Sequence, residues 1–183
     1  MNNIKFIFVQ IIFCVCCSSC LQTYLLNDKK TKVPLNRSVY KNKRDVHLSL
    51  FNYIDTNVVY EKIDYEYFIS NGKYRNTNYC LLRFYPNGNF NEFYVPRNTT
   101  DLNIVDLDPN YRGTRGVYFM LDNKIRFEHF APTSELGTIG KQRGHILVRG
   151  DTLILNTEKP AAFSEVFVRK ILPKNLLRYN ADW

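Results

Sequence analysis

Three pairs of short apolar segments follow one another along this chain, and a turn of two to four residues joins each pair. The paired segments are 79–85 with 90–95, 116–121 with 124–130, and 145–149 with 152–156. The turns between them are Pro86-Asn87-Gly88-Asn89, Asp122-Asn123 and Gly150-Asp151. Turn residues of this kind between aromatic and β-branched runs are typical of β-hairpins. Three hairpins in succession predict an antiparallel meander.

Further strand-like segments bring the predicted sheet to about eight strands, which is enough to close it into a barrel. These segments, rich in Tyr, Val, Ile and Phe, are 58–62, 65–70 and 163–171. We therefore expect an all-β fold, an antiparallel up-and-down meander that closes into a small barrel. Gly116 and Gly144 each follow an arginine near the start of a predicted strand. Glycine at these positions would allow a bulge or a tight barrel corner.

The N-terminus has the three-part layout of a secretory signal peptide. Lys5 precedes a stretch at 6–17 that is apolar except for Gln10, and two serines and Cys20 follow it. Residues 4–19 are too few to span a bilayer comfortably. A cysteine directly after two small residues resembles the lipobox of bacterial lipoproteins. The alternatives are an ordinary cleaved signal with incidental cysteines, and an uncleaved anchor.

The resemblance to the lipobox implies that residues 1–19 are removed and that Cys20 carries acyl chains such as palmitate, which anchor the protein to a membrane. Residues 20–44 would then be the lipidated cysteine and a basic tether, and 45–183 the barrel domain.

Seven Lys and Arg residues and one acidic residue lie in 21–44, so the rest of the mature chain is nearly neutral. Because a nucleic-acid surface would carry its basic residues on the folded domain, we expect no nucleic-acid partner. We expect Cys80 to be a small buried apolar residue.

The leader, the tether and the meander together resemble the lipocalin-like lipoproteins of bacterial cell envelopes. The segments that carry this resemblance are YCLLRFYPNGNF, from Tyr79, and GTRGVYFMLDNKIRFEHF, from Gly113. Membership would imply a lipid-anchored envelope protein whose lipocalin-like barrel is able to hold a small apolar ligand. The acidic export signal that this family places after the lipidated cysteine is absent from residues 21–24. Its absence favours a periplasm-facing location.

Two functions compete for such a barrel. An interior filled by side chains favours a non-catalytic structural or protein-interaction module, which would present its two longer connections, 96–112 and 131–143, to an envelope protein. The alternative is a carrier of a small apolar ligand or lipid. Bulky apolar residues at the expected inward positions favour the filled interior. These residues are Leu82, Phe84, Phe119, Phe127 and Phe167.

No motif in the chain predicts an enzyme, a cofactor or a metal site. The three histidines, His47, His129 and His145, lack metal-ligand spacing. We expect His129, which shares a strand face with Ile125 and Phe127, to be a core or rim histidine. Residues 137–142 lack the spacing and the following helix of a phosphate-binding loop and are interpreted as a glycine-rich turn. The single acids near strands, Glu128, Asp151 and Glu165, give no sign of pairing. An enzyme would need polar residues that cluster inside the barrel.

Overall fold

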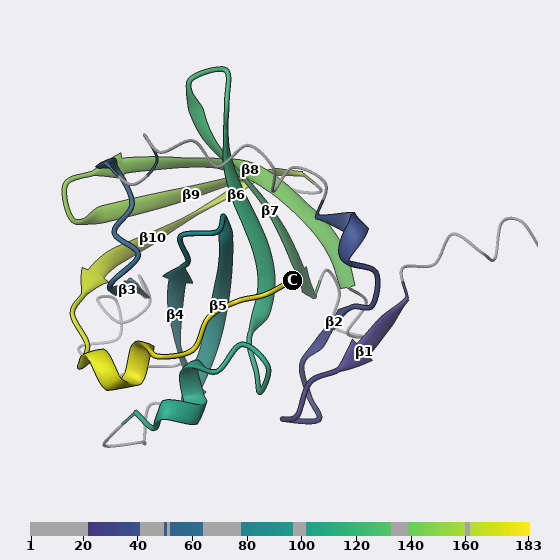
Figure 1. Cartoon of the computed structure of the whole chain (residues 1–183). Helices are drawn as coiled ribbons and strands as arrows, with labels where there is room; N and C mark the ends of the chain where they lie inside the picture. The colour runs from purple at the N-terminus through teal and green to yellow at the C-terminus, as the bar shows by residue number, and fades with distance from the viewer. Residues whose placement is uncertain are drawn as a thin grey trace, which may run out of the picture.

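The computed structural model describes residues 22–40, 50, 52–63, 78–96, 102–132, 139–159 and 162–183. Eight strands in these ranges form a closed barrel (Figure 1). They are β3 (Val59–Lys62), β4 (Asn78–Phe84), β5 (Asn89–Pro96), β6 (Thr114–Leu121), β7 (Lys124–Pro132), β8 (Ile139–Arg149), β9 (Thr152–Lys159) and β10 (Phe163–Lys170). Each strand pairs antiparallel with the next, and β10 closes the barrel by pairing with β3, with Phe167 opposite Lys62. The predicted all-β meander that closes into a barrel is confirmed.

The local chemistry of the predicted hairpins explains why the strands turn where they do. Asp122 and Asn123, between β6 and β7, both have positive φ, 52° and 57°. A two-residue type I′ turn requires this conformation, which Asp and Asn tolerate better than most residues. The turn places Leu121 opposite Lys124 and sets the register of the whole β6–β7 pair.

Gly116 and Gly144 lie where another chain segment leaves no room for a side chain. A Cβ atom on Gly116 would lie 2.2 Å from the ring of Phe90, which packs across β6 at this point. On Gly144 it would lie 1.9 Å from the carbonyl oxygen of Asn156. The β8–β9 register shifts between Arg143 and Gly144, so the bulge expected at this glycine is present.

Side chains fill the barrel interior at the end that carries the three hairpin turns. We call this region the apolar half. Rings pack edge to face within it, with the Phe84 and Tyr118 centroids 5.0 Å apart, and Leu50 and Ile54 contribute from outside the strands. Its members are Leu50, Ile54, Val58, Tyr60, Cys80, Leu82, Phe84, Phe90, Tyr118, Ile125, Phe127, Ile146, Leu153, Leu155 and Phe167.

Four of the five residues expected to point inward, Leu82, Phe84, Phe127 and Phe167, belong to the apolar half. The inward assignment of Phe119 is wrong. Successive side chains of a strand point to opposite faces, and Tyr118, its neighbour on β6, is the residue that points inward. Phe119 is therefore on the outer face, opposite Arg126, where it is nevertheless buried.

Residues 22–40 are not the unstructured tether that their polar, basic sequence suggests. A two-stranded hairpin of β1 (Thr23–Leu25) and β2 (Lys32–Pro34), followed by η1 (Arg37–Val39), packs on the outside of the barrel (Figure 1). Val33 is fully buried, and the hydroxyl of Tyr24, opposite it, accepts a hydrogen bond from Arg115 Nη1 at 2.9 Å. Three-residue strands are too short to show a periodic pattern in the sequence.

The C-terminal residues also pack on the outside of the barrel. After η5 (Lys174–Leu177) the chain crosses the outer face of β4 and β5, as Figure 1 shows in yellow. Two side chains of the β4–β5 hairpin donate hydrogen bonds to carbonyl oxygens of the C-terminal residues. Asn87 Nδ2 donates to Ala181 at 2.5 Å, and Asn89 Nδ2 donates to Trp183 at 3.4 Å. Trp183, only 3% exposed, ends the chain with its ring 4.6 Å from the Arg115 guanidinium carbon.

The two longer connections differ from expectation. β7 continues to Pro132 and β8 begins at Ile139, so most of the connection expected at 131–143 is strand, and Gly140 lies in a strand, not in a glycine-rich turn. Within 96–112, η4 (Ile104–Leu107) buries Leu107 against the outer face of β5. The leader, Cys20, His47 and the predicted strand at 65–70 lie outside the described residues. None of the helices in the described ranges has the length and apolar character needed to cross a membrane.

Candidate functional site: the polar half of the barrel

The barrel interior changes character away from the hairpin turns, where polar side chains replace apolar ones on the inward faces of the strands. The pattern is clear on β5, whose inward residues are Phe90, then Glu92, then Tyr94. We call this region the polar half. Its inward residues include Lys62, Glu92, Tyr94, Thr114, His129, Ala131, Gln142, Phe163 and Glu165.

The polar half contains a cavity of about 580 Å³ that opens at the rim of the barrel. Glu92, Tyr94, Thr114, Gln142 and Glu165 line it, together with the apolar surface of Ala131, Pro132, Ile139 and Phe163. Lys30, Thr31 and Lys32 of the N-terminal hairpin complete the lining. A concave site with apolar walls and a few convergent polar groups is the usual form of a small-molecule site.

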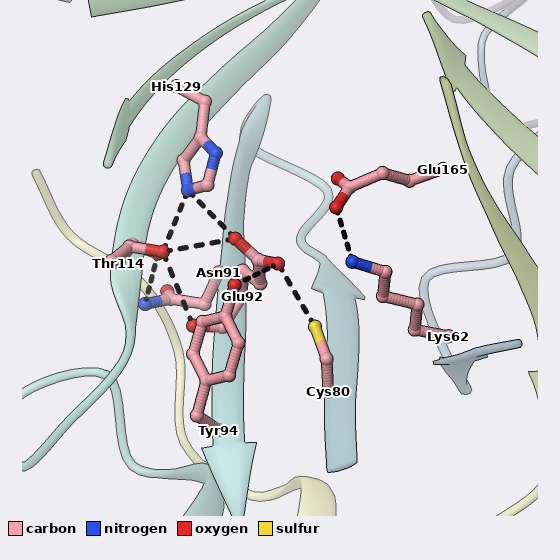
Figure 2. A network of polar contacts seen from close by, with 8 residues as sticks. All are labelled: Lys62, Cys80, Asn91, Glu92, Tyr94, Thr114, His129 and Glu165. Carbon is pink, nitrogen blue, oxygen red and sulfur yellow. Dashed lines mark hydrogen bonds and ion pairs between the residues drawn. The ribbon is translucent and has the colours of Figure 1, made fainter. Parts of the chain in front are cut away.

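Glu92 is at the centre of the polar contacts (Figure 2). Its side chain is buried, with the residue 5% exposed. Oε1 accepts hydrogen bonds from Tyr94 Oη at 2.7 Å and from Cys80 Sγ at 3.0 Å. Oε2 lies 3.4 Å from Thr114 Oγ1 and 3.5 Å from His129 Nε2. Donors on β4, β5 and β6 thus hold the carboxylate in one orientation, and His129 of β7 lies beside it.

His129 lies beside Thr114 and Glu92 in the barrel wall, with its Nε2 2.7 Å from Thr114 Oγ1. Burial lowers the pKa of His129 from its ordinary value of 6.5, and the nearby Glu92 and Glu165 carboxylates oppose this effect. At neutral pH the ring is therefore uncharged. The Thr114 hydroxyl has one proton and contacts both His129 and Glu92. Both contacts are hydrogen bonds when His129 Nε2–H donates to Thr114 Oγ1 and the Thr114 hydroxyl donates to Glu92 Oε2.

Lys62 and Glu165 form an ion pair on the opposite wall, between β3 and β10 (Figure 2). Burial lowers the pKa of Lys62, but the hydrogen bond to Glu165 and that carboxylate's charge raise it overall. Lys62 is therefore positively charged at neutral pH, and its ion-pair partner is Glu165. Tyr94 is held in its phenol form, because partial burial and the adjacent Glu92 raise the pKa of its hydroxyl.

Two features of these contacts differ from those of a site for nucleophilic catalysis. A histidine that activates a hydroxyl is oriented by a carboxylate on its other ring nitrogen, whereas Thr114 and Glu92 both contact Nε2 of His129. Burial and the neighbouring Glu92 raise the pKa of the Cys80 thiol well above its ordinary value, which disfavours the reactive thiolate. Within the described residues, no group of three or more His, Cys, Asp or Glu side chains is placed to hold a metal ion.

The residues named from the sequence fall unevenly on this site. Leu82, Phe84, Phe127 and Phe167 lie in the apolar half, and His129 points inward as expected. Glu165, which had no predicted partner, pairs with Lys62, and Cys80 is buried. Glu92, Thr114 and Gln142 were missed, although the alternation of Phe90, Glu92 and Tyr94 on one strand face is a signal for a polar interior.

Comparisons of the chain with protein-family models, with curated protein sequences and with solved structures find no match. The geometry of the polar half is therefore the basis for the function proposed below.

Proposed function

We propose that this protein is a lipid-anchored binding module of a bacterial cell envelope whose barrel holds a small molecule in its polar half. The observation that carries the proposal is the buried Glu92 and its hydrogen-bonding partners at a cavity of about 580 Å³. Such a volume is within the range typical of small-molecule sites. A barrel that served only as a scaffold would gain stability from apolar side chains at these positions.

The interior of the barrel disfavours a purely apolar ligand. The apolar half is occupied by the protein's own side chains, including Phe84, Tyr118 and Phe127. An acyl chain in the polar half would lie against Glu92 and would remove that carboxylate from water without compensating its charge, which is costly. The side-chain-filled interior that the sequence favours is therefore the apolar half. The polar half suits a molecule with polar groups.

The sequence supports the anchor, and the hairpin adds a geometric consequence. Two residues of extended chain span at most about 7 Å, and Gln22 begins the described chain two positions after Cys20. A lipid on Cys20 would therefore hold the N-terminal hairpin close to the bilayer surface. Lys30 and Lys32 of this hairpin line the cavity, so the opening of the polar half would lie near the membrane.

Native mass spectrometry of the full chain, released from bacterial membranes in a mild detergent, tests the binding function. We expect an adduct of a small molecule on the wild-type protein. Ala131→Trp would place a large ring in the cavity and should abolish the adduct, whereas Leu147→Trp on the outer face of β8 should retain it. An adduct that survives Ala131→Trp, or wild-type protein without any adduct, would count against the proposed function.

A further inference from the structure

Among the described residues, no Lys or Arg side chain forms an ion pair with Glu92. Its partners are the Tyr94 and Thr114 hydroxyls, the Cys80 thiol and the His129 ring. Hydrogen bonds from neutral donors orient a carboxylate and leave its net charge in place. Buried charges are normally paired, so this one is suited to receive a cation that the protein itself does not supply.

Glu92 shares one ammonium group with a second carboxylate. The charge of Glu92 helps to raise the pKa of Lys62, but the ion-pair partner of Lys62 is Glu165. The two carboxylates and the single ammonium leave this part of the cavity with an excess of negative charge. A ligand group that carries a positive charge and can donate hydrogen bonds would therefore be favoured here.

The walls of the cavity above Glu92 are aromatic and apolar. Tyr94 is 49% exposed and Phe163 40% exposed, and both line the cavity from strands β5 and β10. Exposed rings in a concave site provide apolar contact area and attract cations to their faces. Ala131 and Ile139 add further apolar surface. This zone suits a short hydrocarbon body.

The rim of the cavity has the opposite charge. Lys30 and Lys32 line the cavity from the N-terminal hairpin, and both residues are exposed. Neither ammonium group has an ion-pair partner in the parts of the chain that the structure describes. Negative charge at depth and positive charge at the rim give the cavity a polarity along its length.

We propose that the ligand is a small zwitterion that places its ammonium group at Glu92, its apolar body between Tyr94 and Phe163, and its anionic group at Lys30 and Lys32. This inference rests on the proposed binding function and names the chemical class of the ligand. It differs from the apolar ligand that the resemblance to lipocalin-like proteins implies.

Isothermal titration of the purified full chain, kept soluble in amphipol at about pH 7.5, where His129 is neutral, tests the inference. The probes are 6-aminohexanoate, hexylamine and hexanoate, which share an apolar body and differ only in their charged ends. We expect 6-aminohexanoate to bind the wild-type protein about tenfold or more tightly than hexanoate, because a charge-assisted hydrogen bond is lost with the ammonium group.

Two variants assign the two ends of the ligand. Glu92→Gln should weaken both amines about tenfold and leave hexanoate unchanged. The double variant Lys30→Gln/Lys32→Gln should weaken 6-aminohexanoate to the affinity of hexylamine and leave hexylamine unchanged. Lys29→Gln, on the same hairpin but outside the cavity lining, is the matched control and should bind all three probes as the wild type does.

The comparison of the three probes on the wild-type protein stands even if a variant fails to fold. Equal affinity for hexanoate and 6-aminohexanoate, or no binding of any probe, would overturn the ligand class. Unchanged amine binding by a folded Glu92→Gln protein would do the same. A small-molecule adduct that disappears in Ala131→Trp would then still support the binding function, so the two proposals fail separately.

Discussion

Nε2 of His129 lies 3.5 Å from Oε2 of Glu92, inside the barrel. Burial keeps the imidazole neutral, because the pKa of His129 lies below its ordinary value of 6.5 even though Glu92 and Glu165 favour the charged form. In the unfolded chain the same histidine takes up a proton as the pH falls through about 6.5. The native and unfolded states therefore bind different numbers of protons in weakly acidic solution.

This difference makes the stability of the barrel depend on pH. Between 6.5 and the lower pKa of the native state, the unfolded chain binds more protons, so the free energy of unfolding should fall as the pH falls. Thermal unfolding between about pH 7.5 and 5 measures the effect. His129→Gln should make this profile flatter, and an identical slope in the variant and the wild type would show that another group is responsible.

Phe127→Ala tests the separation of the two halves of the barrel. Phe127 is buried in the apolar half, so the cavity left by its ring should cost about 3–5 kcal/mol in the free energy of unfolding. Binding of 6-aminohexanoate by the folded variant should stay within about twofold of wild type, because the ligand would lie in the polar half. Leu121→Ala, at an exposed position, is the control and should change stability by about 0.5 kcal/mol or less. A large loss of binding in Phe127→Ala would mean that the ligand reaches into the apolar half.

Trp183→Ala should destabilise both ends of the chain. The guanidinium carbon of Arg115 lies 4.6 Å from the Trp183 ring and 5.8 Å from the Tyr24 ring, so one side chain links the C-terminal residues to the N-terminal hairpin. We expect a loss of about 3–5 kcal/mol and faster tryptic cleavage at Lys29 and Lys30. Ile171→Ala, at an exposed position, should change neither. Wild-type cleavage rates in Trp183→Ala would disprove the link.

Cys20→Ala tests the lipid anchor. The variant should accumulate as unprocessed, unlipidated precursor and should lose metabolic labelling with palmitate, because the lipobox resemblance assigns the acylated thiol to this residue. Cys80→Ala is the matched control, since Cys80 is buried in the barrel, and it should label as the wild type does. Full labelling of Cys20→Ala would show that the lipobox interpretation is incorrect.

The sequence predicts the barrel well because the signals for its hairpins are local. Asp122-Asn123 and the segments around it carry both turn chemistry and strand alternation, and neither depends on distant residues. The hairpin at 23–34 lacks such a signal, because its strands have three residues each and it is stabilised by contact with the barrel, through Val33 and the Tyr24–Arg115 hydrogen bond. The inward prediction for Phe119 is wrong because a shift of one residue exchanges the two faces of a strand.

The polar half was harder to predict because its residues are distant in the sequence. Thr114 is 22 residues from Glu92 and 15 from His129, and only the closed barrel brings the three together. Each one alone is an ordinary polar residue within a strand. Once the register is known, the position of Glu92 between Phe90 and Tyr94 on one inward face shows that the interior changes from apolar to polar.

The most direct test of the central claim, that the polar half of the barrel is a ligand site, is a screen of small fragments by amide chemical-shift perturbation on the 15N-labelled full chain. We expect fragments that carry an amine to perturb the amides of Glu92, Thr114, Gln142 and Glu165, which line the cavity, and to leave the outer-face amides of Arg126 and Leu147 unchanged. Ala131→Trp should abolish these perturbations. Fragments that perturb only the outer face, or perturbations that persist in Ala131→Trp, would contradict the claim.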